Sequence, residues 1–308
     1  MGRISDWQSN SKTISAGAAQ TIAFTSSDIP ASGVVMYHII LTGTGNTLAA
    51  IDRFRVKSNG LPFIDITSGL YRAFIQRFTG GRVHYPANQA QPPTPSAAGT
   101  VQDWRRFTIP LCFVDREKSE EADVCQFPVG SAPTVEIVMN TGAVAGTAFI
   151  GWTETDVTPL CWPKLYSQQA NIAASAANAR FPLVEDAVIR GFGVETTGLN
   201  RFRAVLNGTQ IYHAQGQPAN STSFTEDMMF LETEQLAGGV TYSLATAVTA
   251  ALDNSIVDPA WIKVTKGERA TAGRSFCEFQ TTGAWSGATS ELGVYAIQPY
   301  EGKPDAGY

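Results

Sequence analysis

The sequence predicts an all-β fold in which one structural unit occurs twice. Three observations lead to this expectation: many short runs with strand-like alternation, turn residues between those runs, and a segment that recurs in the second half of the chain. Many short strands at this spacing are typical of a sandwich or barrel. The 308 residues are enough for about two domains.

A segment of fourteen residues recurs at an offset of 148 residues. Residues 52–65 read DRFRVKSNGLPFID and residues 200–213 read NRFRAVLNGTQIYH, with five identical positions. Chance would give about one match in such a window. A second pair follows in the same order, because TGAVAG at 141–146 recurs as TGAWSG at 282–287, an offset of 141. The common order and similar offsets predict an internal duplication.

Each copy of the repeated segment contains the strongest short signal for a β-hairpin. Asn-Gly pairs, which tolerate the positive φ angles of a type I′ turn, lie between two strand-like runs. The structural turn residues are therefore expected to be Asn59, Gly60, Asn207 and Gly208. The flanking runs alternate Arg with an apolar residue, as half-buried strands do. We expect these arginines to face solvent rather than to bind a ligand.

A helix is predicted after each hairpin, followed by a return to strands. In the first half, Leu70, Phe74 and Phe78 form an apolar stripe within Ser68–Phe78. The second half has a similar pattern at about 223–234. The expected later strands lie at 107–109, 111–114, 135–139 and 148–152, and then at 242–244, 261–264, 276–279 and 292–297.

The predicted organisation has two large domains with short flanking segments. We expect an N-terminal arm at 1–12, a first domain at 13–165, a linker at 166–181, a second domain at 182–300 and a tail at 301–308. The linker is inferred from a composition rich in Ala, Gln, Asn and Ser. Within the first domain, the proline-rich range 86–101 is expected to be an inserted loop, and the charged range 115–123 a solvated loop.

The composition limits which partners the chain can have. Charged residues make up 16% of the chain and the net charge is −5. Lys and Arg are scattered, whereas direct nucleic-acid binding needs a basic face. No signal peptide is visible, and no apolar run approaches the about 20 residues of a membrane span. We therefore expect a soluble chain that makes no direct contact with nucleic acid.

The layout resembles the double jelly-roll major capsid proteins of tailless, membrane-containing icosahedral phages. The resemblance is to the corticovirus-like, finnlakevirus-like and tectivirus-like members of this family, and this chain is most similar to the compact versions. In that family an Asn-Gly or Asp-Gly hairpin recurs in both barrels, as Asn59-Gly60 and Asn207-Gly208 do here. The resemblance covers about 13–300. It implies two tandem eight-stranded jelly-roll barrels with short helices.

The resemblance also implies a function and a set of partners. Such a chain would be the major capsid protein of a virion, with no enzymatic activity and no cofactor. Its homotrimers would be pseudo-hexameric, because each subunit supplies two similar barrels, and would tile an icosahedral shell over an internal lipid membrane. Other copies of the chain, penton proteins and membrane proteins would be its partners, and assembly would occur in the host cytoplasm.

Residues with catalytic or metal-binding potential are sparse and scattered. The three histidines, His38, His84 and His213, lie far apart, and none has a Cys or carboxylate at ligand spacing. No nucleophile elbow, dinucleotide fingerprint or phosphate-binding loop occurs. The cysteines sit in or beside apolar stretches and are expected to be buried free thiols: Cys112, Cys125, Cys161 and Cys277. No catalytic, cofactor-binding or metal-ligating residue is therefore nominated.

Two other functions fit a tandem jelly roll. A carbohydrate- or receptor-binding module, either a virion spike or a lectin-like protein, would expose two or three tryptophans on one face. An enzyme such as a glycosidase or amidase would need two carboxylates at a suitable separation. No pair of carboxylates in the sequence is singled out for that role.

Overall fold

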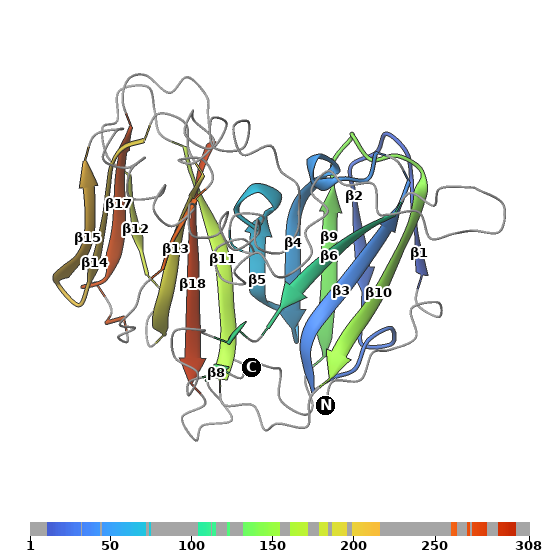
Figure 1. Ribbon diagram of the computed structural model, residues 1–308, viewed down its shortest axis with the longest axis horizontal. Coiled ribbons are helices and arrows are strands. Elements are labelled where there is room, and N and C mark those ends of the chain that lie inside the picture. Colours follow the sequence, from blue (N-terminus) through green and yellow to red (C-terminus); the bar gives the residue numbers. More distant parts are fainter. Residues whose placement is uncertain are drawn as a thin grey trace, which may run out of the picture. The chain divides into compact units, whose positions relative to one another are not determined.

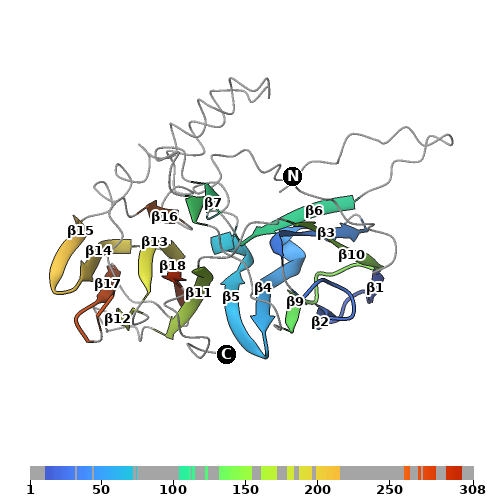
Figure 2. The same cartoon turned by 90° about the horizontal axis from the view of Figure 1, so that it is seen from below.

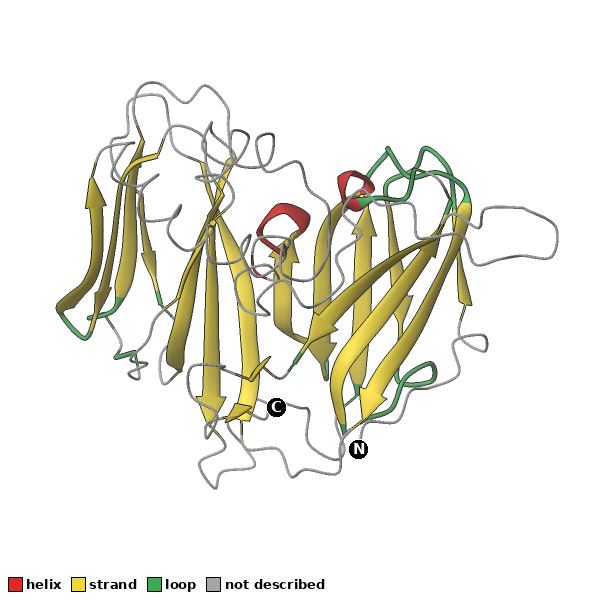
Figure 3. Cartoon of the chain, in the orientation of Figure 1, coloured by secondary structure: helices red, strands yellow, loops and turns green. Residues whose placement is uncertain are grey.

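The computed structural model consists largely of β-strands in two compact units (Figures 1 and 3). Unit 1 takes its described residues from the ranges 1–68, 83–163 and 299–308, and unit 2 from 69–82 and 164–298. The structure describes residues 11–31, 33–43, 45–71, 74, 104–111, 113–114, 122–123, 132–154, 161–171, 179–183, 187–195, 199–215, 260–263, 270–271, 273–281 and 289–299.

Unit 1 is a sandwich of two layers of antiparallel sheet, with four strands of the unit in each layer (Figure 2). In the first sheet the order is β1 (Ser11–Ile14), β10 (Gly146–Glu154), β3 (Val34–Thr42) and β6 (Trp104–Pro110). In the second sheet it is β5 (Leu61–Thr67), β4 (Ile51–Ser58), β9 (Pro133–Met139) and β2 (Gln20–Phe24). A 3₁₀ turn at Leu48–Ala50 precedes β4.

Unit 2 likewise has two layers of antiparallel sheet, with four strands of the unit in each. In the first, the order is β11 (Cys161–Asn171), β18 (Thr289–Pro299), β13 (Val188–Glu195) and β16 (Ala260–Lys263). In the second, it is β15 (Thr209–Gln215), β14 (Leu199–Leu206), β17 (Phe276–Thr281) and β12 (Ala179–Pro182).

The two units share one topology. To compare the units, the eight strands of each are numbered 1 to 8 in chain order. In both units the strands of one layer then follow the order 1-8-3-6, and those of the other layer follow the order 5-4-7-2. A short ribbon of β7 (Phe113–Val114) and β8 (Ala122–Asp123) lies outside this count. Eight strands in two interleaved antiparallel sheets form a jelly roll. The predicted fold class, all-β with two tandem eight-stranded jelly rolls, is confirmed.

The core of unit 1 lies between its two sheets because strand residues alternate between the two faces of a sheet. Strand β9 shows this alternation along its whole length, with Val135, Ile137 and Met139 fully buried. Across the sandwich, the rings of Phe54 and Phe107 lie 5.7 Å apart. Burial of each large side chain contributes about 1.5–3 kcal/mol.

In unit 2, strand β18 is buried on both faces. From Glu291 to Ile297 every residue is buried, whereas a strand with one solvated face would alternate. A helical segment of unit 2, of which residues 69–71 and 74 are described, contributes to this burial. The ring of Phe74 meets that of Tyr295 edge-on at 5.2 Å. The apolar stripe predicted for this helix is buried at Leu70 and Phe74.

The expected linker at 166–181 differs from the structure. Its first six residues continue strand β11, and residues 179–181 belong to β12. The Ala- and Gln-rich composition carries little strand propensity, but pairing with β18, distant in sequence, stabilises the extended backbone. The expected N-terminal arm at 1–12 also overlaps β1, which begins at Ser11.

Several other expectations need adjustment or lie beyond the described residues. The last residues of the charged range 115–123 form β8, which pairs with β7, rather than a continuous loop. The proline-rich insertion at 86–101, the helix at 223–234, the strand at 242–244 and the tail at 301–308 lie outside the described residues.

Candidate functional site

The two Asn-Gly pairs occupy corresponding turns, each the tip of a two-residue hairpin. Asn59 and Gly60 join β4 to β5 with φ angles of 50° and 82°. Asn207 and Gly208 join β14 to β15 with φ angles of 52° and 83°. Positive φ at both central residues defines the type I′ turn, whose twist matches that of the flanking strands. The two turns therefore have nearly the same backbone conformation.

A β-bulge follows each turn at the same position. In unit 1 the register shifts between Val56 and Lys57, which leaves Phe63 as the extra residue. In unit 2 it shifts between Ala204 and Val205, which leaves Ile211 as the extra residue. Phe63 and Ile211 are themselves related by the sequence offset of 148. Bulges redirect side chains, and here the outcomes differ because Phe63 is 3% exposed and Ile211 39%.

The turn of unit 1 is anchored to one neighbouring residue. Asn59 N donates to the carbonyl oxygen of Ala132 at 3.2 Å, and Ala132 N donates to Asn59 Oδ1 at 3.0 Å. Ala132 immediately precedes β9, the strand that pairs with the other side of β4. The turn side chain thus fixes the tip of the hairpin to the start of the next strand.

The turn of unit 2 is anchored more extensively, to the segment before β17. Thr271 N donates to Asn207 Oδ1 at 2.8 Å, and the buried Ser275 Oγ donates to the same oxygen at 3.2 Å. Asn207 N donates to Ser275 Oγ at 3.0 Å, and Gly208 N donates to the Arg274 carbonyl oxygen at 2.9 Å. Two chemically identical turns are therefore held by different hydrogen-bond networks.

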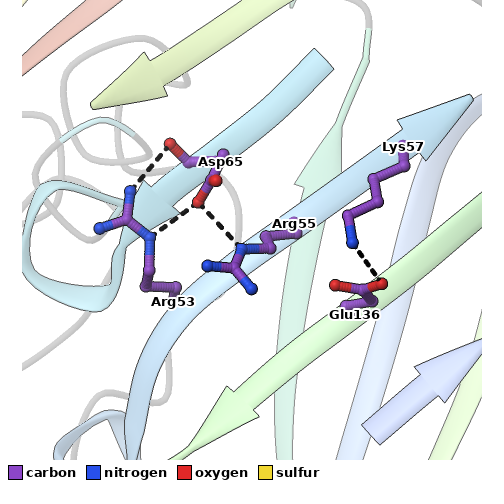
Figure 4. A network of polar contacts seen from close by, with 5 residues as sticks. All are labelled: Arg53, Arg55, Lys57, Asp65 and Glu136. Atoms are coloured by element: carbon purple, nitrogen blue, oxygen red, sulfur yellow. Dashed lines mark hydrogen bonds and ion pairs between the residues drawn. The ribbon is translucent and has the colours of Figure 1, made fainter. Parts of the chain in front are cut away.

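Charged side chains lie on the face of the β4–β5 hairpin opposite the core of unit 1 (Figure 4). Arg53 Nε donates to Asp65 Oδ1 at 2.7 Å, and Arg55 Nε donates to the same oxygen at 3.2 Å. Lys57 Nζ meets Glu136 Oε1 at 2.7 Å. The exposed fractions of the Arg53 and Arg55 side chains are 17% and 30%. The sequence had suggested that these arginines simply face solvent, but in the structure both are ion-paired to Asp65.

Unit 2 keeps part of this charge pattern. Glu278 occupies the position of Glu136, since each lies opposite the second arginine of its hairpin strand. Arg203 Nη2 lies 3.5 Å from Glu278 Oε2, and its guanidinium carbon lies 5.4 Å from the ring centre of Phe276. The position of Asp65 is taken by His213. Cross-strand pairs of this kind each contribute about 0.2–1 kcal/mol, so they align strands rather than form a reactive site.

The repeated Thr-Gly-Ala motif of unit 1 is a packing site for a buried asparagine. Asn46 Nδ2 donates to the carbonyl oxygens of Thr42 and Val144 at 2.6 and 3.0 Å, and Val144 N donates to Asn46 Oδ1 at 3.0 Å. A Cβ at Gly146 would lie 2.2 Å from the Thr42 carbonyl oxygen, so the position requires glycine. The second copy of the motif, at 282–287, lies outside the described residues.

The histidines do not converge in the described part of the chain. His38 is buried in unit 1 with its ring nitrogens 3.2 Å from Thr108 Oγ1 and 2.9 Å from Thr153 Oγ1. His213 lies in β15 of unit 2, and His84 is outside the described residues. Within the described ranges, no group of three or more His, Cys, Asp or Glu side chains is placed to hold a metal ion.

Two further observations bear on the chemistry of the chain. Cys277 is a fully buried free thiol, and burial raises its pKa well above the usual range, which makes it a poor nucleophile at neutral pH. No helix among the described residues is long and apolar enough to cross a membrane. The described side chains named above organise strands and turns.

Sequence reasoning located the turns but missed their anchors. Ala132 and Ser275 carry no signal of their own, because they meet the asparagines only once β9 and β17 have paired with the hairpins. The acceptor role of Asp65 was also missed, because Asp65 faces Arg55 only as a result of the bulge at Phe63, which the sequence does not reveal.

The fold and these repeated hairpins define the class of architecture as a double jelly roll. Solved structures with this fold are similar to the chain over nearly its full length. The major capsid protein P2 from bacteriophage PM2 has a TM-score of 0.60 and 12% identity, and the match covers 97% of this chain and 98% of that one.

Two further solved structures are similar as well. One is the STIV MCP, with a TM-score of 0.59 and 14% identity over 99% of this chain and 100% of that one. The other comes from the atomic structure of Sulfolobus turreted icosahedral virus, with a TM-score of 0.61 and 14% identity over 97% and 92%. No protein-family model and no curated protein sequence matches the chain.

Proposed function

We propose that this chain is a major capsid protein, a structural subunit that catalyses nothing. The observation that carries the proposal is the repetition of one eight-strand topology in both units, with strand orders 1-8-3-6 and 5-4-7-2. Near full-length similarity to proteins named as major capsid proteins supports it. Because the sequence identity is only 12–14%, this similarity shows the fold alone. The role in a shell is therefore inferred from the architecture.

A duplicated barrel suits a shell because it changes the symmetry of the oligomer. Three copies of a chain with two similar barrels present six similar flanks, so a homotrimer is pseudo-hexameric and can tile a surface. The proposed barrels are the eight-strand sets of unit 1 and unit 2, and the turns Asn59-Gly60 and Asn207-Gly208 close the same hairpin in each.

Exposed apolar side chains are candidates for contacts between copies. Among the described residues, the exposed large hydrophobic side chains are Leu61, 44% exposed, and Ile211, 39% exposed. Leu61 directly follows its hairpin turn, and Ile211 lies near the start of β15, which is the last strand of its sheet in unit 2. Association that covers such residues removes apolar area from water, which contributes a favourable free energy of about 25 cal/mol per Å² buried.

The remaining partners follow from the same proposal. A net charge of −5 without a basic run disfavours direct contact with the genome and fits a shell that overlies an internal membrane. We propose the virion as the location, the host cytoplasm as the place of assembly, and penton and membrane proteins as neighbours. The arm at 1–12 and the tail at 301–308 are the proposed segments for those contacts.

The first test is the oligomeric state of the purified full-length chain, measured by sedimentation at several concentrations. We expect a trimer, and Ile211→Asp is expected to weaken it because a charge would be buried in the contact. Thr209→Asp, on the same exposed stretch of β15, is the matched control for charge alone. A chain that stays monomeric at all concentrations would contradict the proposal.

The second test asks whether the trimers build a shell. Electron microscopy of the assembled material should reveal closed icosahedral particles. The competing function, a carbohydrate- or receptor-binding module, predicts instead a monomer or small oligomer that binds specific glycans on an array. Glycan binding without particles would favour that module over the capsid role.

A further inference from the structure

The two Asn-Gly turns contain the residue pair that deamidates most readily in proteins. The backbone nitrogen of the glycine can attack the side-chain amide carbon of the asparagine, and glycine has no Cβ to hinder the approach. In both turns, a Cβ built on the glycine would meet nothing within 4 Å, so the surroundings are open. The chemistry of the two sites is the same, and any difference in rate must come from the fold.

The fold treats the two sites differently. Asn59 is exposed, and the two hydrogen bonds described above both involve the backbone of a single residue, Ala132. Asn207 is half-buried, and its Oδ1 accepts from both Thr271 N and Ser275 Oγ. Rotation of the asparagine amide toward the backbone must break these bonds, so the electrophile is held more firmly in unit 2.

The nucleophile is restrained in unit 2 as well. Gly208 N donates to the Arg274 carbonyl oxygen at 2.9 Å. In unit 1, the corresponding residue, Ala132, accepts instead from Asn59 N at 3.2 Å. In unit 2, the glycine nitrogen and the asparagine side chain must therefore both leave hydrogen bonds before they can meet. In unit 1, the hydrogen bonds among the described residues hold the asparagine alone.

We propose that Asn59 is a site of spontaneous deamidation in the folded protein and that Asn207 is protected from it. Gly60 N forms a bond to Asn59 Cγ, the Cγ–N bond to the side-chain nitrogen breaks, and ammonia leaves. Water then opens the resulting succinimide at either carbonyl and leaves an aspartate or an isoaspartate. The net reaction consumes one water, releases one ammonia and adds one negative charge to the chain.

This modification would act on the hairpin of unit 1 selectively. An isoaspartate places an extra backbone atom in the two-residue turn, which no longer fits the register of β4 and β5. The exposed Leu61 is the first residue of β5 and adjoins the turn. Ageing of the protein is therefore expected to alter the tip of one hairpin while its counterpart stays intact.

The test is to hold the intact full-length protein at mildly alkaline pH and follow both sites by peptide mapping and mass spectrometry. We expect Asn59 to convert about tenfold faster than Asn207, the ratio that one to two net hydrogen bonds give. The same chain unfolded in urea should lose this difference. Equal rates in the folded protein, or an unchanged ratio in urea, would overturn the proposal.

A matched variant identifies the cause. Ser275→Ala removes the hydroxyl that both donates to Asn207 Oδ1 and accepts from Asn207 N. The rate at Asn207 should rise several-fold toward that of Asn59, and the rate at Asn59 in the same sample should not change. If the deamidation rate at Asn59 rose to the rate measured in urea, the variant would be unfolded. The proposal would then be decided by the rates at Asn59 and Asn207 in the folded wild-type protein. An unchanged rate at Asn207 in a folded variant would refute the assigned mechanism.

Discussion

The hairpin turns of the two units share a backbone conformation but not their surroundings. The φ angles of Asn59 and Asn207 differ by only 2°, from 50° to 52°. Asn59 is held by Ala132, whereas Asn207 is held through Thr271 and Ser275, with Arg274 binding the neighbouring glycine. A local sequence can therefore fix the shape of a turn twice, while the strands around it decide how firmly each turn is held.

The largest expected effect tests whether each unit has its own core. Phe54 is fully buried in unit 1 against Phe107, so Phe54→Ala should lower the free energy of unfolding by about 3–5 kcal/mol. Hydrogen exchange would measure the loss strand by strand. Exchange should rise in β4 and β9, with little change in β13 and β18.

Phe192→Ala is the mirror experiment, because Phe192 is fully buried in β13 of unit 2. It should destabilise β13 and β18 by a similar amount. If either variant loosened both units equally, the description of two separately packed units would be wrong.

The comparison between the turns becomes sharper when their side chains are removed without strain. Glycine tolerates positive φ, so Asn207→Gly and Asn59→Gly remove only the side-chain bonds. We expect losses of about 2 kcal/mol for Asn207→Gly and about 1 kcal/mol for Asn59→Gly, since Asn207 Oδ1 accepts two hydrogen bonds and Asn59 Oδ1 one. Chemical denaturation measures both, and a larger loss at Asn59 would reverse the ranking.

The charged face gives a smaller effect. Asp65 accepts from both Arg53 and Arg55, so Asp65→Asn should lower the free energy of unfolding by about 1 kcal/mol. A rise in salt concentration should weaken the wild type more than the variant, because the carboxylate charge is already gone. An equal salt response in both proteins would assign the effect to other charges.

The smallest effect concerns the pH dependence of unit 1. Burial raises the pKa of Asp28, but hydrogen bonds from Thr25 and Lys12 and the charge of Lys12 outweigh it, so the net pKa is lowered. A carboxyl group with a depressed pKa stabilises the fold above the ordinary aspartate pKa, and this contribution disappears as pH falls through the lowered value.

The corresponding experiment is Lys12→Met, which removes the ion pair between Lys12 Nζ and Asp28. The variant should lose about 0.5 kcal/mol near neutral pH and differ less from the wild type in acid. Thermal unfolding at several pH values measures this. A difference that grows in acid would have the wrong sign for the assigned pair.

Much of the architecture could be read from the residues. The Asn-Gly pairs, the Arg-x-Arg alternation and the offset of 148 together led to the all-β duplication and its two jelly rolls. The segment 166–181 did not reveal its strands, because its residues become strand through pairing with β18 at its start and with β17 at its end. The arginine partners were likewise hidden, since Asp65 and Glu136 are brought close to them by strand register.

The sequence by itself determined the turns, the alternation of the strands and the apolar stripe of the helix that begins at Ser68. These features depend on the φ preferences of single residues and on periods of two or 3.6 residues, which are local. Tertiary structure alone decided what the stripe covers and what holds each turn. Phe74 packs against Tyr295, and Asn207 binds Ser275, because the pairing of strands brings together residues that no local pattern connects.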